Sequence, residues 1–142
     1  MDRRKRNRLC TWLIIFGLSN FILYAIGYSI IGGDAPNGYI KGEGAQSVYY
    51  VRGHFVHRMV GYEQDVPKWV WMYSYIHSIS IWPSIAVVLL AMLTLARPHI
   101  MATYQRGIMT GATLVVVVAT VIVIVTSVVM LSFVVTFIRL LW

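Results

Sequence analysis

The hydrophobic residues of this chain gather in three long runs, and polar segments separate them. The runs cover residues 9–32, 69–96 and 108–138. A helix of about 20 residues crosses a ~30 Å hydrocarbon core, and each run is long enough to do so. The third run is rich in Val and Ile, but in lipid only a helix satisfies the backbone of such a segment. The pattern predicts an all-α membrane protein with three transmembrane helices.

The first run follows a basic segment, MDRRKRNR, at residues 1–8. A secretory signal peptide begins in the same way, but its apolar region is roughly 7–15 residues long and an A-x-A cleavage site follows it. This run is longer, and no such site follows. We therefore expect an uncleaved membrane anchor. Asn20 lies near its middle, where a side-chain amide prefers a partner on a neighbouring helix.

The second run contains one proline and is followed by another. Pro83 removes the usual hydrogen bond to the Ile79 carbonyl and can kink the helix. Pro98 restricts the backbone of Arg97, so the helix is predicted to end at residue 96. Residues 97–107 then form a short turn before the third helix. The last four residues, 139–142, lie beyond that helix.

Composition supports the membrane assignment and removes other classes. Hydrophobic residues make up 58% of the 142 residues and charged residues 12%, with a mean hydropathy of +0.70. A single cysteine, Cys10, excludes an internal disulfide; we interpret it as a small apolar residue rather than a palmitoylation site. The net charge of +7 comes from cations near the helix ends, which membrane topology explains without nucleic acid.

The basic residues also predict an orientation. Cytoplasmic segments carry an excess of Lys and Arg, and the N-terminal cluster has five of them. The N-terminus is therefore predicted to be cytoplasmic, and residues 33–68 and the C-terminus exoplasmic. One side then holds Arg3, Arg4, Lys5, Arg6, Arg8, Arg97 and Arg106, and the other holds Lys41, Arg52, Arg58, Lys68 and Arg139.

Residues 33–68 are too aromatic for a simple linker, and we expect an ordered cap. Glycine, Pro36 and Asn37 mark turns in its first half, where Asp34 is suited to cap a local turn. The later segments SVYYVR and HFVHRMV have strand-like composition, which favours a small hairpin or two short strands.

The cap offers one candidate metal site, formed by His54, His57 and Asp65. Imidazole and carboxylate groups are suitable ligands for zinc or copper. However, a spacing of three residues places the two imidazoles on opposite faces of a strand. Arg52 and Arg58 also flank the histidines, and their charge opposes a dication. An exoplasmic metal sensor is therefore the third of three hypotheses.

Tyr73, His77, Ser80 and Ser84 form a polar stripe on the second helix, because their spacing is four, three and four residues. An ionisable group inside a membrane is a functional candidate. Tyr73 and His77 are thus a candidate cofactor site, for a quinone head group or a haem. The alternative, which we favour, is that His77 bonds to the cap. Haem ligation by two histidines would need a second chain, because no other helix has a histidine at this level.

Several motifs of enzymes are absent from the sequence, including a phosphate loop, a dinucleotide-binding fingerprint, CxxC, HExxH and GxSxG. The three runs also lack central charges and an inverted repeat, which disfavours a transporter. No catalytic residue is predicted.

Three short motifs carry a resemblance to a known group. They are GGDAPNG at residues 32–38, YYV at residues 49–51 followed by His54, and YSYIH at residues 73–77. The chain resembles small uncharacterised bacterial membrane proteins with GGDAxNG, YY(L/V) plus His, and YSxxH. Those proteins continue with Thr-His-Pro, whereas this chain has Ser80-Ile81-Trp82-Pro83, so a role for a second histidine is not carried over. The resemblance implies a bacterial membrane and an outer cap, and no activity.

We therefore predict a non-enzymatic accessory or interaction protein of the bacterial cytoplasmic membrane. The alternative is a redox subunit that binds quinone or haem near Tyr73 and His77. Membrane lipid is one expected partner, another membrane protein or a second copy is another, and neither nucleic acid nor a cofactor is expected. The predicted partner-binding residues are Asp34, Tyr49, Tyr50, Arg52 and His54.

Overall fold

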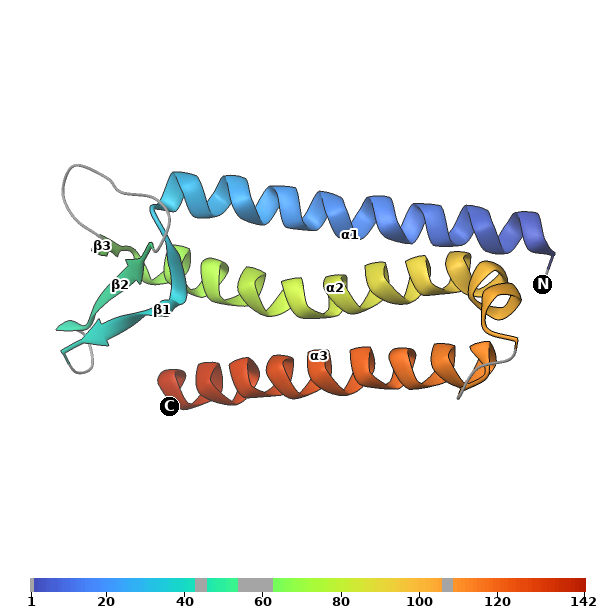
Figure 1. The fold of residues 1–142 in the computed structure, drawn as a ribbon. Coiled ribbons are helices and arrows are strands. Elements are labelled where there is room, and N and C mark those ends of the chain that lie inside the picture. The colour runs from blue at the N-terminus through green and yellow to red at the C-terminus, as the bar shows by residue number, and fades with distance from the viewer. Residues whose placement is uncertain (1, 43–45, 54–62, 106–108) are drawn as a thin grey trace. The chain divides into compact units, whose positions relative to one another are not determined.

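The computed structural model describes residues 2–42, 46–53, 63–105 and 109–142. These residues form three long helices and one small sheet (Figure 1). The helices are α1 (Arg3–Ile31), α2 (Lys68–Thr103) and α3 (Gly111–Leu141); the strands are β1 (Asp34–Lys41), β2 (Val48–Arg52) and β3 (Glu63–Val66). Each helix is long and apolar enough to cross a membrane. The three predicted helices are thus confirmed, whereas the all-α description is corrected by the sheet.

The prediction that Pro98 ends the second helix is wrong. α2 continues through Pro98 to Thr103, so residues 97–103 belong to the helix and not to the predicted turn. Proline removes a single backbone donor, and the helix beyond it still closes its own bonds. The Thr103 hydroxyl donates to the His99 carbonyl over 3.0 Å, and the Tyr104 amide donates to the Ile100 carbonyl over 3.0 Å. One lost bond is too small a cost to end the helix.

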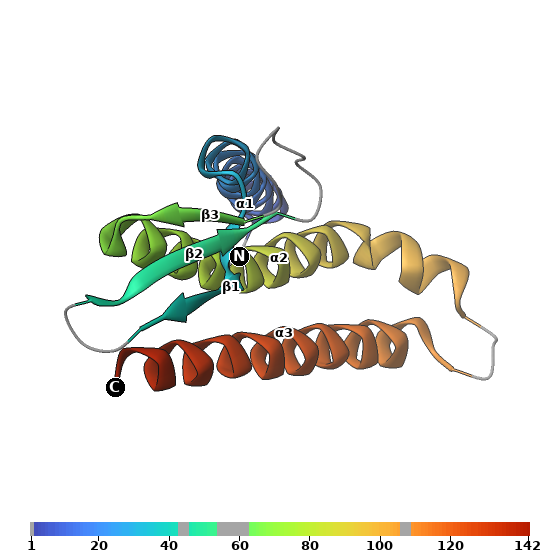
Figure 2. The same cartoon turned by 90° about the vertical axis from the view of Figure 1, so that its left-hand side faces the viewer.

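The cap contains more strand than its sequence suggests. Within SVYYVR, residues 48–52 form β2 as predicted, whereas HFVHRMV lies outside the described residues. The first half, expected to be turns, forms β1, and EQDV forms β3. All three strands pair antiparallel in the order β1-β2-β3, and Figure 2 shows β2 between the other two. The glycine and proline residues of β1 interrupt a strand rather than replace it.

A bulge explains how β1 accommodates those residues. Asp34 pairs with Arg52 and Tyr39 pairs with Tyr50, so the register shifts between Asp34 and Tyr39. A bulge leaves extra residues unpaired and bends its strand. A Cβ atom at Gly38 would overlap the Tyr50 carbonyl, so the close approach of the two strands requires glycine there.

The described chain divides into two compact units. The first comprises Met1–Asn20 and Trp82–Leu131, and it holds α1 against α2. Within it, the Asn20 amide donates to the Ser84 hydroxyl over 2.8 Å, which confirms the predicted partner on another helix. Gly17 lies so close to Val88 that a Cβ atom would overlap its side chain. Cys10 is buried in this unit.

The second unit comprises Phe21–Ile81 and Ser132–Trp142, and it contains the sheet. Its core consists of Ala35, Val51, Trp71 and Tyr75. Trp71 is fully buried and its ring centroid lies 5.1 Å from that of Tyr75 and 6.2 Å from that of Phe137. Its indole N–H has no hydrogen-bond partner among the described residues, so packing of the large ring must offset that cost. This core holds the sheet on the first turns of α2.

Candidate functional site

The register gives the sheet two chemically different sides. Directly paired residues share a side, and neighbours along a strand alternate. The core side carries Ile40, Tyr49, Val51 and Val66, all of which belong to or pack against the core cluster. The other side, called here the outer side, consists of Tyr39, Lys41, Val48, Tyr50, Arg52, Glu63 and Asp65.

Two stacked tyrosines form the centre of the outer side. The ring centroids of Tyr39 and Tyr50 lie 4.8 Å apart, and the ring planes differ by 17°. The Tyr39 hydroxyl donates to a Glu63 carboxylate oxygen over 3.0 Å, across the width of the sheet. This hydrogen bond raises the pKa of Tyr39 above its ordinary value of 10.0, because the bond favours the protonated phenol. The pair is thus fixed in position although Tyr39 is exposed.

Charges of both signs surround this pair. Lys41 and Arg52 are cationic, Glu63 and Asp65 are anionic, and all four are exposed. Arg52 pairs in register with Glu63 across β2 and β3, where opposite charges stabilise a sheet. Tyrosine and arginine are enriched among residues that carry binding energy in protein interfaces. The outer side therefore has the composition of a polar protein-binding surface with an aromatic centre.

A second polar group lies at the opposite end of β1, around Asp34. This carboxylate is 7% exposed, and a buried charge needs hydrogen bonds to be stable. The Tyr24 hydroxyl donates to Oδ2 over 3.0 Å, and the Asn37 amide donates to Oδ1 over 2.7 Å. The second bond joins two side chains within β1, so the local turn predicted at Asp34 is replaced by strand. We call Tyr24, Asp34 and Asn37 the Asp34 cluster.

The Asp34 cluster joins β1 to both helices around it. Tyr24 belongs to α1, and the backbone amide of Ala35 donates to the Ser74 hydroxyl of α2 over 3.1 Å. Gly33, in the connection from α1 to β1, has φ +152°, and a Cβ atom there would overlap the Arg52 backbone. The chain therefore enters β1 through a fixed, crowded connection. The cluster has a structural role that its hydrogen bonds explain.

His77 lies beside the same cluster, among aromatic rings. Its ring centroid is 5.5 Å from that of Tyr24 and 5.5 Å from that of Tyr73, both in edge-on contacts. The cavity that it lines with Tyr24, Tyr73 and Ser74 has a volume of about 10 Å³. Such a space holds about one water, whereas organic ligands occupy pockets of roughly 300–1,000 Å³. The enclosed space beside His77 is therefore too small for a quinone ring or a haem.

The predicted partner-binding residues fall into separate places. Tyr50 and Arg52 lie on the outer side, Tyr49 lies on the core side, and Asp34 is buried in its own cluster. His54 lies outside the described residues.

The predicted metal site is described only in part. Asp65 lies on the outer side, and His54 and His57 lie outside the described residues. Among the residues that are described, no three His, Cys, Asp or Glu side chains lie close enough together to hold a metal ion.

Sequence reasoning missed Tyr39, Glu63, Tyr24 and Asn37. Tyr39 could have been found if β1 had been predicted, because Tyr39 and Tyr50 then share one side by alternation. The contact of Tyr24 with Asp34 joins a helix to a strand, and no local pattern in the sequence indicates it.

Comparisons with known protein families, with curated proteins and with solved structures find no match for this chain.

Proposed function

We propose that this chain is a non-enzymatic accessory protein of the bacterial cytoplasmic membrane, and that the outer side of its sheet binds another membrane protein. The observation that carries the proposal is the stacking of exposed Tyr39 on half-buried Tyr50, with ring centroids 4.8 Å apart and charges of both signs around them. Ordered aromatic rings lose little conformational freedom on binding, which makes them efficient contact residues.

The position of the sheet favours a partner in the same membrane. Two glycines join α1 to β1, and Pro67 alone joins β3 to α2. These connections keep the outer side close to the ends of two helices that are apolar enough to span a bilayer. The distribution of basic residues favours a cytoplasmic N-terminus and an exoplasmic sheet. The resemblance to small bacterial membrane proteins supports the bacterial membrane.

The proposal is tested by comparing tagged full-length chains purified from native membranes in mild detergent. In the test variant, Tyr39 and Tyr50 are both replaced by Ser. In the control variant, Trp69→Ser removes an aromatic ring that is 72% exposed and lies outside the sheet. Quantitative mass spectrometry then compares the membrane proteins recovered with each chain.

We expect one membrane protein to be recovered with the wild-type chain and with the control. Its recovery with the double variant should fall at least about tenfold, because loss of an interface anchor costs about 2 kcal/mol or more. Recovery that both variants leave unchanged, or that both reduce equally, contradicts the proposal. If the recovered protein is a second copy of this chain, the outer side is a binding surface for self-association and not for another membrane protein.

A further inference from the structure

The first two turns of α1 carry positive charge around the whole helix. Most residues at positions 3–8 are basic, namely Arg3, Arg4, Lys5, Arg6 and Arg8. Successive residues of an α-helix are rotated by about 100°, so the side chains of Arg3 to Arg6 together cover the circumference. All of these basic residues except Arg6 are exposed. The charge therefore faces every side of the helix rather than one neighbouring element.

The first unit offers little negative charge to balance these cations. Its sequence contains seven basic residues and one acidic residue, Asp2, a net charge of +6, whereas the second unit contains five and four, a net charge of +1. Arg4 and Arg8 lie about one turn apart, where like charges destabilise a helix. The Nε atom of Arg6 is buried and has no hydrogen-bond partner among the described residues. Apart from Asp2, the described part of the first unit thus lacks anions that would stabilise these cations.

α2 adds a cation at the same level of the first unit. In this unit the two helices run antiparallel (Figure 1), and Asn20 bonds to Ser84. Arg8 lies 12 residues before Asn20, and Arg97 lies 13 residues after Ser84, so the two arginines are at about the same level. Arg97 is exposed. We call the following residues the cationic end of the first unit: Arg3, Arg4, Lys5, Arg6, Arg8 and Arg97.

Trp12 indicates where the cationic end lies in a bilayer. Its side chain is 60% exposed, and tryptophans are enriched at the membrane–water interface. Arg8 precedes Trp12 by about 6 Å of helix, and Arg3 precedes it by about 14 Å. The headgroup region extends about 5–8 Å beyond the hydrocarbon core on each side. In a chain that spans the bilayer, the cationic end therefore lies among and just beyond the lipid headgroups.

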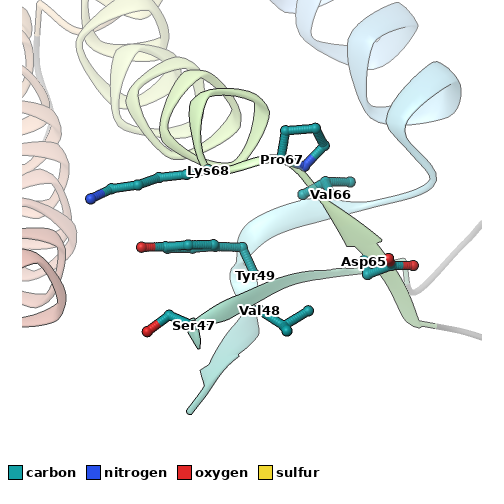
Figure 3. Close-up of a pocket in the computed structure, with 7 residues that line it drawn as sticks. All are labelled: Ser47, Val48, Tyr49, Asp65, Val66, Pro67 and Lys68. Carbon is teal, nitrogen blue, oxygen red and sulfur yellow. The ribbon is translucent and has the colours of Figure 1, made fainter. Parts of the chain in front are cut away.

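A groove in the second unit shows the contrasting case. It lies between the sheet and the start of α2, has a volume of about 550 Å³, and is lined by Ser47, Val48, Tyr49, Asp65, Val66, Pro67 and Lys68 (Figure 3). The Lys68 ammonium is directed toward one side of this groove and the Asp65 carboxylate toward the other. A lipid phosphate beside the groove would meet both signs of charge. The cationic end is the better match for an anion.

We propose that the cationic end of the first unit binds anionic phospholipids in preference to zwitterionic ones. Headgroups surround a membrane helix on every side, as its cations do, whereas a docked protein or nucleic acid would cover one side only. Arginine donates charge-assisted hydrogen bonds to phosphate oxygens, and each basic residue near an anionic surface raises the affinity roughly fivefold. A zwitterionic headgroup carries its own ammonium, which the cations repel. The inference does not depend on the proposed protein partner.

The test uses the purified full-length chain in mild detergent. Dioleoylphosphatidylglycerol and dioleoylphosphatidylcholine, which have the same acyl chains, are added separately at equal concentrations, and native mass spectrometry measures the lipid bound. We expect the glycerol lipid to bind at least about tenfold more tightly, because several cations contribute. Equal binding of the two lipids overturns the proposal. Displacement of the bound lipid by equimolar glycerophosphoglycerol also overturns it, since the surface would then take a soluble anion.

Two matched variants locate the surface. Arg4→Gln combined with Arg8→Gln removes two charges from the cationic end, and glutamine keeps a helix-favouring residue at both positions. We expect this variant to bind the glycerol lipid at least about tenfold more weakly and the choline lipid as before. Lys68→Gln combined with Arg139→Gln removes two charges from the second unit and should leave the preference unchanged. A preference that the first variant retains, or that both variants lose equally, contradicts the proposal.

Discussion

Tyr49 and Tyr50 are neighbours in β2, yet they lie on opposite sides of the sheet. Tyr49 packs against the core cluster, where its ring centroid is 5.6 Å from that of Trp71. Tyr50 stacks on Tyr39 on the outer side. The comparison teaches that aromatic content alone does not identify a binding surface. The alternation of the strand places one ring against the core and the other on the surface that we propose contacts a partner.

The same contrast separates the polar groups of the two regions. The Asp34 carboxylate is buried, and both of its oxygens accept hydrogen bonds within the fold. Glu63 and Asp65 are exposed, and Glu63 accepts a hydrogen bond from the Tyr39 hydroxyl. A carboxylate whose bonding capacity is met inside the protein has little left for a ligand. We therefore expect substitutions near the core to affect stability and substitutions on the outer side to affect binding.

The largest expected effect is that of Trp71→Ala. The side chain is fully buried, and removal of a buried tryptophan costs about 3–5 kcal/mol of unfolding free energy. Trp69→Ala is the matched control, since that ring is mostly exposed, and its cost in detergent should stay within about 0.5 kcal/mol. Protease resistance of the cap across a urea series, in mild detergent, measures both. Similar losses for the two variants would contradict the assignment of the core.

Asp34→Ala should have the next largest effect. It leaves the Tyr24 hydroxyl and the Asn37 amide without their acceptor, and loss of a hydrogen bond to a charged group costs about 1.5–3 kcal/mol. The same urea series measures it, with Asp65→Ala on the outer side as the control. A second measurement combines Asp34→Ala with Tyr24→Phe. If the two residues are coupled, the double variant loses less stability than the sum of the single variants, and additive losses would contradict the hydrogen bond.

Gly38→Ala tests the bulge. Its Cβ atom would overlap the Tyr50 carbonyl, and overpacking of this kind costs about 1–3 kcal/mol. Gly27→Ala is the control, because a Cβ atom there meets nothing within 4 Å and alanine favours a helix by about 0.5–1 kcal/mol. The two substitutions should therefore change stability in opposite directions. A stabilised Gly38→Ala variant would show that the strands do not approach as described.

The smallest expected effect concerns Tyr39 and pH. Its pKa is raised by the hydrogen bond to Glu63, so the bond stabilises the sheet fully below the ordinary tyrosine pKa of 10.0 and is lost as the pH rises through the raised value. Absorbance of the phenolate follows the ionisation. Glu63→Ala should move that ionisation back toward the ordinary value. A titration curve that Glu63→Ala leaves unchanged would contradict the bond.

The helices were predictable because long apolar runs leave the chain few alternatives in lipid. The position of Asn20 indicated a partner on another helix, and its amide donates a hydrogen bond to the Ser84 hydroxyl of α2. The end of α2 was predicted wrongly, because the helix tolerates Pro98 and continues to Thr103. β1 was missed because the glycine, proline and asparagine residues that predict turns lie in a bulge within the strand.

The candidate site was predictable only in part. Tyr50 and Arg52 were selected from composition, and both lie on the outer side. Composition could not separate Tyr50 from Tyr49, because the sides of β2 are distinguished only once its pairing is known. Asp34 was selected for the same kind of reason, yet it bonds to Tyr24 ten residues earlier on α1. Contacts between elements of this kind leave no periodic signal in one sequence.

We propose that the outer side of the sheet contacts a partner and that the core side does not. A photocrosslinking amino acid placed at Tyr50 or at Tyr49, in native membranes, tests it most directly. The two positions are adjacent in sequence and belong to the same strand, so expression and depth in the membrane are matched. We predict a crosslink to another membrane protein from position 50, and crosslinks only within the chain from position 49. A partner crosslinked from position 49 and not from position 50 would contradict the account.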